Sequence, residues 1–184
     1  MLILAPKKKN PKPTHTTHTH TQKKKLPLMT SALKDFSISK LKETVHKQKQ
    51  GYKAGGVTIP PCTVTNKGCW LSSKTPSNNG YIKVKSNVLR TSSSSKVEFY
   101  LHVCAYLSKS ESPEQKECFI GMMEQGYQVS HLCHNKTCFN PDHLSLETGQ
   151  VNRDRNVCQK LKVIKCECGT IHNPCPHEPK CLLS

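Results

Sequence analysis

The sequence predicts an α+β fold with a mixed or antiparallel sheet and an apolar core too small to hold the chain together alone. Hydrophobic residues make up 34% of the 184 residues and aromatic residues 5%, and so thin a core usually needs metal ions or cross-links. The chain has 11 cysteines and 10 histidines that could supply them. Short β-branched and aromatic segments lie between turn residues in 57–104, with helical patterns on either side.

Charge and cysteine content narrow the class of protein. The formal net charge is +16, from 28 Lys and Arg against 12 Asp and Glu, which favours a polyanionic partner such as nucleic acid over a basic tail on a neutral domain. The odd cysteine count, the interleaved histidines and the lack of a secretory signal favour zinc in a reducing compartment over disulfides. No apolar run approaches the length of a membrane span.

The first 29 residues predict a disordered basic tail, because they are rich in Lys, Pro, Thr and His and contain no acidic residue. Its clusters PKKKNPK and QKKKLP resemble nuclear localisation signals or nucleic-acid-binding arms. We therefore expect the protein in the nucleus, including the nucleolus. A mitochondrial presequence is the less favoured alternative, since the charges are lysines broken by prolines.

Residues 30–56 predict an amphipathic helix over 30–50, capped by Thr30 or Ser31, followed by a glycine-rich linker over 51–56. That helix could dock on the core, lie on DNA or serve a dimer. In the β-rich region, Asn79-Gly80 predicts a hairpin turn, and Lys83 and Lys85 share one face of the strand that follows.

The end of that region is ambiguous. The segment KVEFYLHVCAYL could be a strand or a helix. Residues 108–117 then predict a polar loop.

The stretch SHLCHNKTCFNPDHL carries three ligands of one expected zinc ion, Cys133, Cys138 and His143. Structural zinc takes four tetrahedral nitrogen or sulfur ligands, so a fourth must come from elsewhere. Cys69 is the candidate and Cys62 the alternative.

A second zinc site is expected near the C-terminus. Cys175, His177 and Cys181 are closely spaced, and Cys158 can supply the fourth ligand. A site that uses Cys166 or Cys168 in place of Cys181 stays open on spacing alone. The extra pair, with His172, could also be unliganded in an inserted loop.

Between these two sites, residues 148–158 predict a helix with Thr148 near its N-cap and with Asn152, Arg155 and Asn156 on one face. If the strand is extended, His131 and Cys133 lie on the same side of it. A zinc ion bound to Cys133 would then also fix the backbone of His131. Phosphodiester hydrolysis needs a proton acceptor, such as a neutral imidazole, and a hard cation such as Mg²⁺ on one or two protein oxygens. The alternative interpretations without catalysis are that His131 is a zinc-associated histidine and that Asn152 is a helix-surface amide.

Taken together, SHLCHNKTCFNPDHL, NRDRNVC and CPHEPKCL resemble the His-Cys box of nuclear, group I intron-encoded homing endonucleases, members of the ββα-metal (HNH-like, or His-Me finger) nucleases. The resemblance is close over 129–181 and loose over 69–128. It implies a homing endonuclease domain over 57–184 that cuts near-palindromic double-stranded ribosomal DNA as a Mg²⁺-dependent homodimer with two structural zinc ions.

By position, the resemblance makes His131 the general base and Asn152 the Mg²⁺ ligand, and Lys83 or Lys85 replaces a family arginine that contacts the scissile phosphate. The first-zinc ligands would be Cys133, Cys138, His143 and Cys69. The second-zinc ligands would be Cys158, Cys175, His177 and Cys181.

Two features depart from the family pattern. The loop between Cys158 and Cys175 is long, and the chain stops at Leu183-Ser184, so we expect dimerisation through another surface such as the 30–50 helix. The alternative function is a non-catalytic zinc-stabilised DNA-binding protein or a degenerate endonuclease.

Overall fold

The computed structural model describes residues 32–85 and 98–183. The predicted disordered tail, the two candidate caps at 30 and 31, and the end of the segment GYIKVKSNVLR lie outside the described residues. In chain order the elements are α2 Ile38–Gln50, β1 Tyr52–Ala54, β2 Val57–Ile59, β3 Thr63–Val64, β4 Trp70–Leu71, β5 Lys83–Lys85, β6 Glu98–Tyr100, α3 Leu101–Leu107, α4 Pro113–Glu124, β7 Tyr127–His131, the 3-10 turn η1 Pro141–His143, β8 Leu144–Thr148, α5 Gly149–Cys158, β9 Ile164–Lys165 and β10 Ile171–His172.

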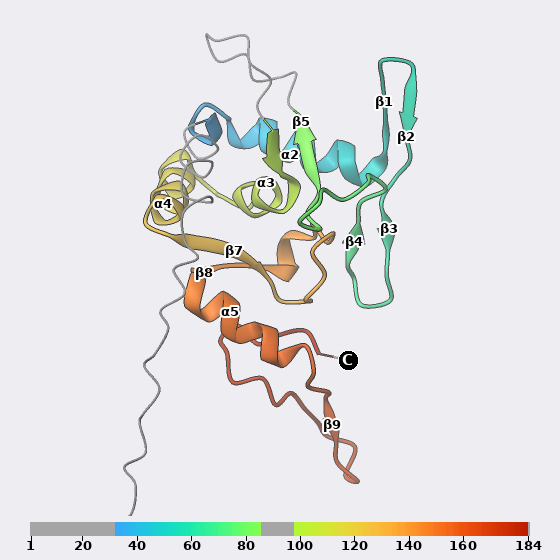
Figure 1. Cartoon of the computed structure of the whole chain (residues 1–184), viewed down its shortest axis with the longest axis vertical. Helices are drawn as coiled ribbons and strands as arrows, with labels where there is room; N and C mark the ends of the chain where they lie inside the picture. Colours follow the sequence, from blue (N-terminus) through green and yellow to red (C-terminus); the bar gives the residue numbers. More distant parts are fainter. Residues whose placement is uncertain (1–31, 86–97, 184) are drawn as a thin grey trace, which may run out of the picture.

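The described strands form five separate two-stranded antiparallel pairs, β1–β2, β3–β4, β5–β6, β7–β8 and β9–β10, so the predicted mixed or antiparallel sheet is antiparallel and divided into pairs. The α+β class itself agrees with this mixture of helices and small sheets. Most of these strands span only two or three residues, so helices and loops cover the core where a wide sheet would otherwise lie. Figure 1 shows β1–β2 and β3–β4 extending from the same side of the body.

The N-terminal helix differs from the expected one. Residues 32–34 are helical, the chain bends at 35–37, and α2 then starts afresh at Ile38 with Ser37 as its N-cap. Ser37 interrupts the expected single helix because its side chain accepts a hydrogen bond from the backbone N–H of Lys40. Leu41 and Val45 are buried in the core, so the apolar face of α2 packs within the chain.

The predicted linker over 51–56 is a hairpin. Tyr52 pairs with Ile59 and Ala54 with Val57. Gly51 has φ +76°, and a Cβ there would lie 2.7 Å from the carbonyl oxygen of Ile59. Glycine is needed at this position because a side chain would collide with backbone.

The ambiguous segment contains both structures, since β6 leads directly into α3. The polar loop over 108–117 is shorter than predicted, because α4 begins at Pro113. Ser112 caps α4 by accepting from the N–H of Gln115, and the Gln115 side chain accepts from the N–H of Glu111. This reciprocal pattern is a capping signal that is easily hidden in a polar sequence.

The predicted turn at Asn79-Gly80 is present, closed by a hydrogen bond from Gly80 N–H to the Ser77 carbonyl oxygen. It does not join two paired strands, because β4 pairs with β3 and β5 with β6. Lys83 and Lys85 do share one face, with Val84 buried between them.

The core lies between α2, α3, α4 and the inner faces of β5–β6 and β7–β8. Phe36 and Phe99 pack edge to face at its centre, 5.1 Å apart. The buried ammonium of Lys116 donates to the carbonyl oxygens of Lys34 and Phe36 at 2.9 and 2.6 Å. Within the described residues, no helix is long and apolar enough to cross a membrane.

A hairpin and a helix follow one another at the centre of the chain. β7 and β8 pair from Tyr127↔Thr148 to His131↔Leu144, and α5 packs against both strands (Figure 1). Thr148 caps α5, as predicted, by accepting from the N–H of Val151. This β7–β8–α5 unit carries His131 and Asn152.

Candidate functional site

The first cysteine–histidine cluster gathers the side chains of Cys69, Cys133, Cys138 and His143, whose ligand atoms all lie within 4.8 Å of one another. The Nδ1 atom of His143 is 3.4 Å from Cys69 Sγ and 3.7 Å from Cys138 Sγ. A tetrahedral zinc ion with bonds of about 2.0–2.3 Å sets its ligands roughly 3.5–3.8 Å apart. The residues present therefore fit a structural zinc ion.

The structure brings Cys69 into this cluster and leaves Cys62 out. Cys62 is half-buried against the apolar core, and burial raises the pKa of its thiol. The turn before β4 places Cys69 in the first cluster. The N–H of Cys69 donates to Thr65 Oγ1 within this turn. β4 then adds backbone contacts to the loop, since Phe139 N–H donates to the Trp70 carbonyl oxygen.

Two thiols of this cluster have opposite pKa shifts. A hydrogen bond from Cys133 lowers the pKa of Cys138 to about 5, and the same bond raises the pKa of Cys133. The lowered pKa of Cys138 favours its thiolate, the form that binds metal.

The second cluster contains Cys158, Cys175, His177 and Cys181, again with all ligand atoms within 4.8 Å. The Nδ1 atom of His177 lies 3.3 Å from Cys158 Sγ and 3.4 Å from Cys175 Sγ, and the two sulfurs are 3.7 Å apart. These spacings also fit tetrahedral zinc. Cys166 and Cys168 are exposed outside the cluster, so Cys181 and neither of them completes it.

Arg155 connects α5 to this second cluster. Its Nε donates to both carboxylate oxygens of Glu147 at 2.8 and 2.9 Å, and its Nη1 donates to the Pro179 carbonyl oxygen and to Cys181 Sγ. Arg155 is only 1% exposed. Of the three residues predicted to share a helix face, Arg155 is buried against β8 and the C-terminal loop, while its neighbour Asn156 is exposed.

His131 ends β7 and is held by the first cluster through the backbone. Its Nε2 donates to the carbonyl oxygen of Cys138 at 3.0 Å. The predicted extended strand through Cys133 is wrong, because the chain turns after His131, with His134 N–H bonded to the His131 carbonyl oxygen. Burial lowers the pKa of His131 to about 4, so the imidazole is neutral at neutral pH.

Two aromatic rings contact His131, and a third packs against those two. The ring of His102, from α3, lies 4.8 Å from it, and the ring of Tyr81 lies 5.9 Å away. Tyr100 lies 5.6 Å from His102. His102 is buried, its Nδ1 has no hydrogen-bond partner among the described residues, and burial lowers its pKa well below the usual value. Two neutral imidazoles thus pack against each other.

Asn152 lies on α5 and contacts β7. Its Nδ2 donates a hydrogen bond to Gln128 Oε1 at 2.9 Å. The amide nitrogen of Asn152 is therefore used in this contact, and the amide oxygen is not. Gln128 is three residues before His131, about 10 Å along an extended strand. Among the described residues no hydrogen bond joins His131 to Asn152, and the β7–β8–α5 unit holds them relative to each other. Nothing in the sequence pattern singled out Gln128.

The candidate cations lie on β5. Lys83 and Lys85 both pair with Glu98, at 3.3 and 3.5 Å. Lys83 also lies over the Tyr100 ring, 5.9 Å from its centroid, and so is linked through Tyr100 and His102 to His131. Lys136, which the sequence analysis did not select, lies 5.5 Å from the Tyr81 ring centroid in the loop between the first-cluster cysteines.

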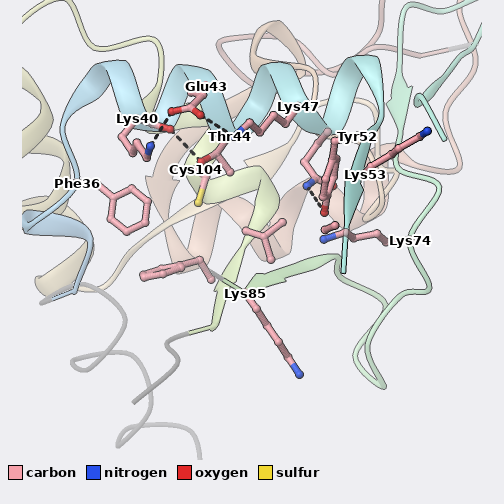
Figure 2. Close-up of a pocket in the computed structure, with 14 residues that line it drawn as sticks. Phe36, Lys40, Glu43, Thr44, Lys47, Tyr52, Lys53, Lys74, Lys85 and Cys104 are labelled. Carbon is pink, nitrogen blue, oxygen red and sulfur yellow. Dashed lines mark hydrogen bonds and ion pairs between the residues drawn. The ribbon is translucent and has the colours of Figure 1, made fainter. Parts of the chain in front are cut away.

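A lysine-rich groove of about 300 Å³ lies between α2, the β1–β2 hairpin and β5. Figure 2 shows Lys40 and Lys47 on either side of Glu43 along α2, with ion pairs of 2.8 and 2.6 Å. Three further lysines line the groove: Lys53, Lys74 and Lys85. Among the described residues, Lys85 is the one of these three that forms a salt bridge, and its partner is Glu98. Its floor is apolar, formed by core residues such as Phe99 and Cys104. The groove is a basic surface separate from His131.

The comparisons with known proteins agree with this geometry. No curated protein and no solved structure matches the chain. One family model does match, described as the zinc-binding loop region of homing endonuclease, over residues 68–184. That span contains all eight residues of the two clusters, together with His131 and Asn152, and it covers more than half of the chain. The chain therefore belongs to this family of homing endonucleases.

Proposed function

We propose that this protein is a site-specific double-strand DNA endonuclease that hydrolyses phosphodiester bonds with His131 as general base and Asn152 as the ligand of a catalytic Mg²⁺ ion. One observation carries most of the proposal: the hydrogen bond from His131 Nε2 to the Cys138 carbonyl oxygen. A carbonyl can only accept, so the proton of the neutral imidazole sits on Nε2. The Nδ1 lone pair is then free to take a proton from water.

The surroundings support this role for His131. His102 and Tyr81 confine the ring on its faces, and the Cys138 bond fixes its orientation. A base held in one orientation loses little entropy when the attacking water binds, which favours the reaction. The proposed zinc at the first cluster stiffens the loop that carries Cys138 and thus holds the base indirectly.

Asn152 is suited to hold a hard cation. Its amide nitrogen is bonded to Gln128, so the side-chain oxygen faces away from that contact. A bound Mg²⁺ would neutralise developing charge on the leaving oxygen while keeping most of its water ligands. Gln128 acts as a positioning residue that keeps the Asn152 oxygen oriented.

Lys83 is the better placed of the two candidate cations for the scissile phosphate. Its side chain is 34% exposed, against 68% for Lys85, and it lies over the ring of Tyr100, which packs on the two residues that contact His131. A lysine provides a point charge where an arginine would bind the phosphate with two hydrogen bonds. Lys136, in the loop between the first-cluster cysteines, would add a second positive charge near the same phosphate.

We propose that the β-rich region and the lysine-rich groove contact DNA. Phosphate contacts orient a duplex, while side chains on hairpins can read base edges in the major groove. The exposed β1–β2 and β3–β4 hairpins extend from one side of the body (Figure 1). We further propose ribosomal DNA as the target, a homodimer on a near-palindromic site, and a nuclear location set by the basic clusters in residues 1–29.

The direct test is to incubate purified zinc-loaded protein with intron-free ribosomal DNA, and with a randomised duplex library, in the presence of Mg²⁺. We expect one staggered double-strand cut at a defined site, lost with EDTA and in the His131→Ala variant. The exposed His46 on α2 gives a matched control, since His46→Ala should cut normally. Specific binding without any cut in either DNA would contradict the nuclease and favour a zinc-stabilised DNA-binding protein.

A further inference from the structure

The loop between the first and second residues of the second cluster carries a hairpin of its own. β9 and β10 pair through Lys165↔Ile171 and Ile164↔His172. Figure 1 shows the β9 region extending away from the main body beyond α5. Its Cys166, Cys168 and His172 are all exposed. Neither cluster includes them, and their three ligand atoms do not all lie within 4.8 Å of one another in this structure, so a bound ion would have to draw them together.

The turn of this hairpin orders the two thiols. Cys166 N–H donates to the Thr170 carbonyl oxygen at 2.9 Å, and Gly169 N–H donates to the Cys166 carbonyl oxygen at 2.9 Å. Gly169 has φ +84°, the left-handed conformation that closes a three-residue hairpin turn. Cys166 and Cys168 are therefore held two residues apart on a defined turn.

The pleat places the donors on one face. Residues opposite each other in an antiparallel pair project to the same side, as do residues two apart on one strand. Ile164 is opposite His172, so Cys166, Thr170 and His172 share that side. Cys168 joins them because its Sγ contacts Thr170 Oγ1 at 3.1 Å.

We propose that Cys166, Cys168 and His172 form a third metal site, open to solvent, that takes a thiophilic divalent ion such as Zn²⁺ with water in the fourth position. His172 is a diagonal neighbour of Cys166, about 7–8 Å away between backbones, a span that an imidazole and a metal–nitrogen bond of about 2 Å can cover. The ion would draw its exposed ring onto the thiols.

The chemistry of the thiols favours metal capture. The side-chain hydrogen bonds that Cys168 makes with Thr170 and Cys166 lower the pKa of its thiol to about 7, which favours the thiolate form that binds metal. The second thiol would release its proton to the buffer as the ion binds. Because this site is exposed and the two clusters are buried, its ion should exchange much faster than theirs.

The experiment uses the full chain and does not depend on nuclease activity. Protein washed with a weak chelator is assayed for zinc and then titrated with Zn²⁺ by calorimetry. We expect two zinc ions to remain after the wash and one further equivalent to bind. Replacing both Cys166 and Cys168 by Ser should abolish that equivalent, and His172→Ala should weaken its binding at least ~10-fold.

Cys118 supplies the matched control, because it is also an exposed cysteine, on α4. Cys118→Ser should bind the additional ion as the unmodified chain does. The circular dichroism spectrum of each variant shows whether it has kept its fold. A chain that binds no additional zinc, or a double cysteine variant that still binds it, would overturn the proposal.

Discussion

The imidazole of His131 donates from Nε2 to the backbone carbonyl oxygen of Cys138, 3.0 Å away. The partner is the backbone of a residue whose sulfur belongs to the first cluster. The proposed base is therefore oriented by the same loop that the proposed zinc holds together. If both proposals hold, the orientation of the base and the zinc-dependent folding of the loop are coupled through Cys138.

Replacing His131 should separate catalysis from binding. We expect His131→Ala to lower the single-turnover cleavage rate by about 10²–10⁴-fold, the usual contribution of a general base. The Kd for the DNA site and the zinc content should stay unchanged. Rapid-quench kinetics and metal analysis measure both. Cleavage at the unmodified rate would show that another group takes the proton.

Asn152 should control the Mg²⁺ requirement. Asn152→Ala removes the proposed oxygen ligand and should raise the Mg²⁺ concentration needed for half-maximal single-turnover cleavage, while Asn152→Asp should restore binding of the cation. Gln128→Ala should produce a smaller shift in the same direction, because it only orients Asn152. A metal dependence that is identical in all three variants would exclude Asn152 as a ligand.

The two β5 lysines should differ in effect. Lys83→Ala should lower the cleavage rate by at least ~10-fold by removing charge near the scissile phosphate. Lys85→Ala should mainly weaken DNA binding and reduce its salt dependence, since Lys85 is more exposed. Rates at saturating protein separate the two. The reverse ranking would assign the phosphate contact to Lys85.

Cys138→Ala should remove one zinc ion per chain and unfold the region around the first cluster. Structural zinc contributes about 10–16 kcal/mol in small peptides, comparable to or larger than the whole stability of a typical domain, about 5–15 kcal/mol. Cys62→Ser is the matched control, because Cys62 lies outside the cluster. Zinc analysis and thermal melting test the pair, and equal zinc content in the two variants would contradict the assignment.

Removing only the arginine of the Arg155–Glu147 pair should lower the free energy of unfolding strongly. Arg155 is 1% and Glu147 7% exposed, so Arg155→Ala leaves a buried carboxylate unpaired, at a cost of about 3–5 kcal/mol. The exposed Lys34–Glu124 pair is the control, and Lys34→Ala should cost less than about 1 kcal/mol. Chemical denaturation gives both free energies of unfolding. Similar losses would mean that Arg155 is less buried in solution.

The sequence predicted best those features that local chemistry determines. Cysteine and histidine spacing identified both clusters, because metal ligands must be close in space and here are mostly close in sequence. Thr148 marked the start of α5 because a cap acts on its own first turn. The segment 96–107 could only be left open between strand and helix, since three strand residues precede the helix and a strand that short shows no periodicity.

Features that depend on partners far along the chain escaped prediction. Arg155 lies on a polar helix, and nothing local shows that it is buried against Glu147 and Pro179. The pairing of β5 with β6 left the turn at Asn79-Gly80 without a strand pair of its own. One local feature was also missed: Ser112 and Gln115 form a helix cap, but the polar residues around them favoured the prediction of a loop. His102 contacts His131 only because α3 packs beside β7.

The long loop between Cys158 and Cys175 has an evolutionary consequence. Its two ends meet in the second cluster, where the sulfurs are 3.7 Å apart, and doubling the length of a flexible closed loop costs only about 0.6 kcal/mol. Insertions, deletions and substitutions in this segment should therefore have little effect on the second cluster, which holds its two ends together. Such a segment can acquire new surface residues during evolution while the proposed catalytic residues His131 and Asn152 stay unchanged.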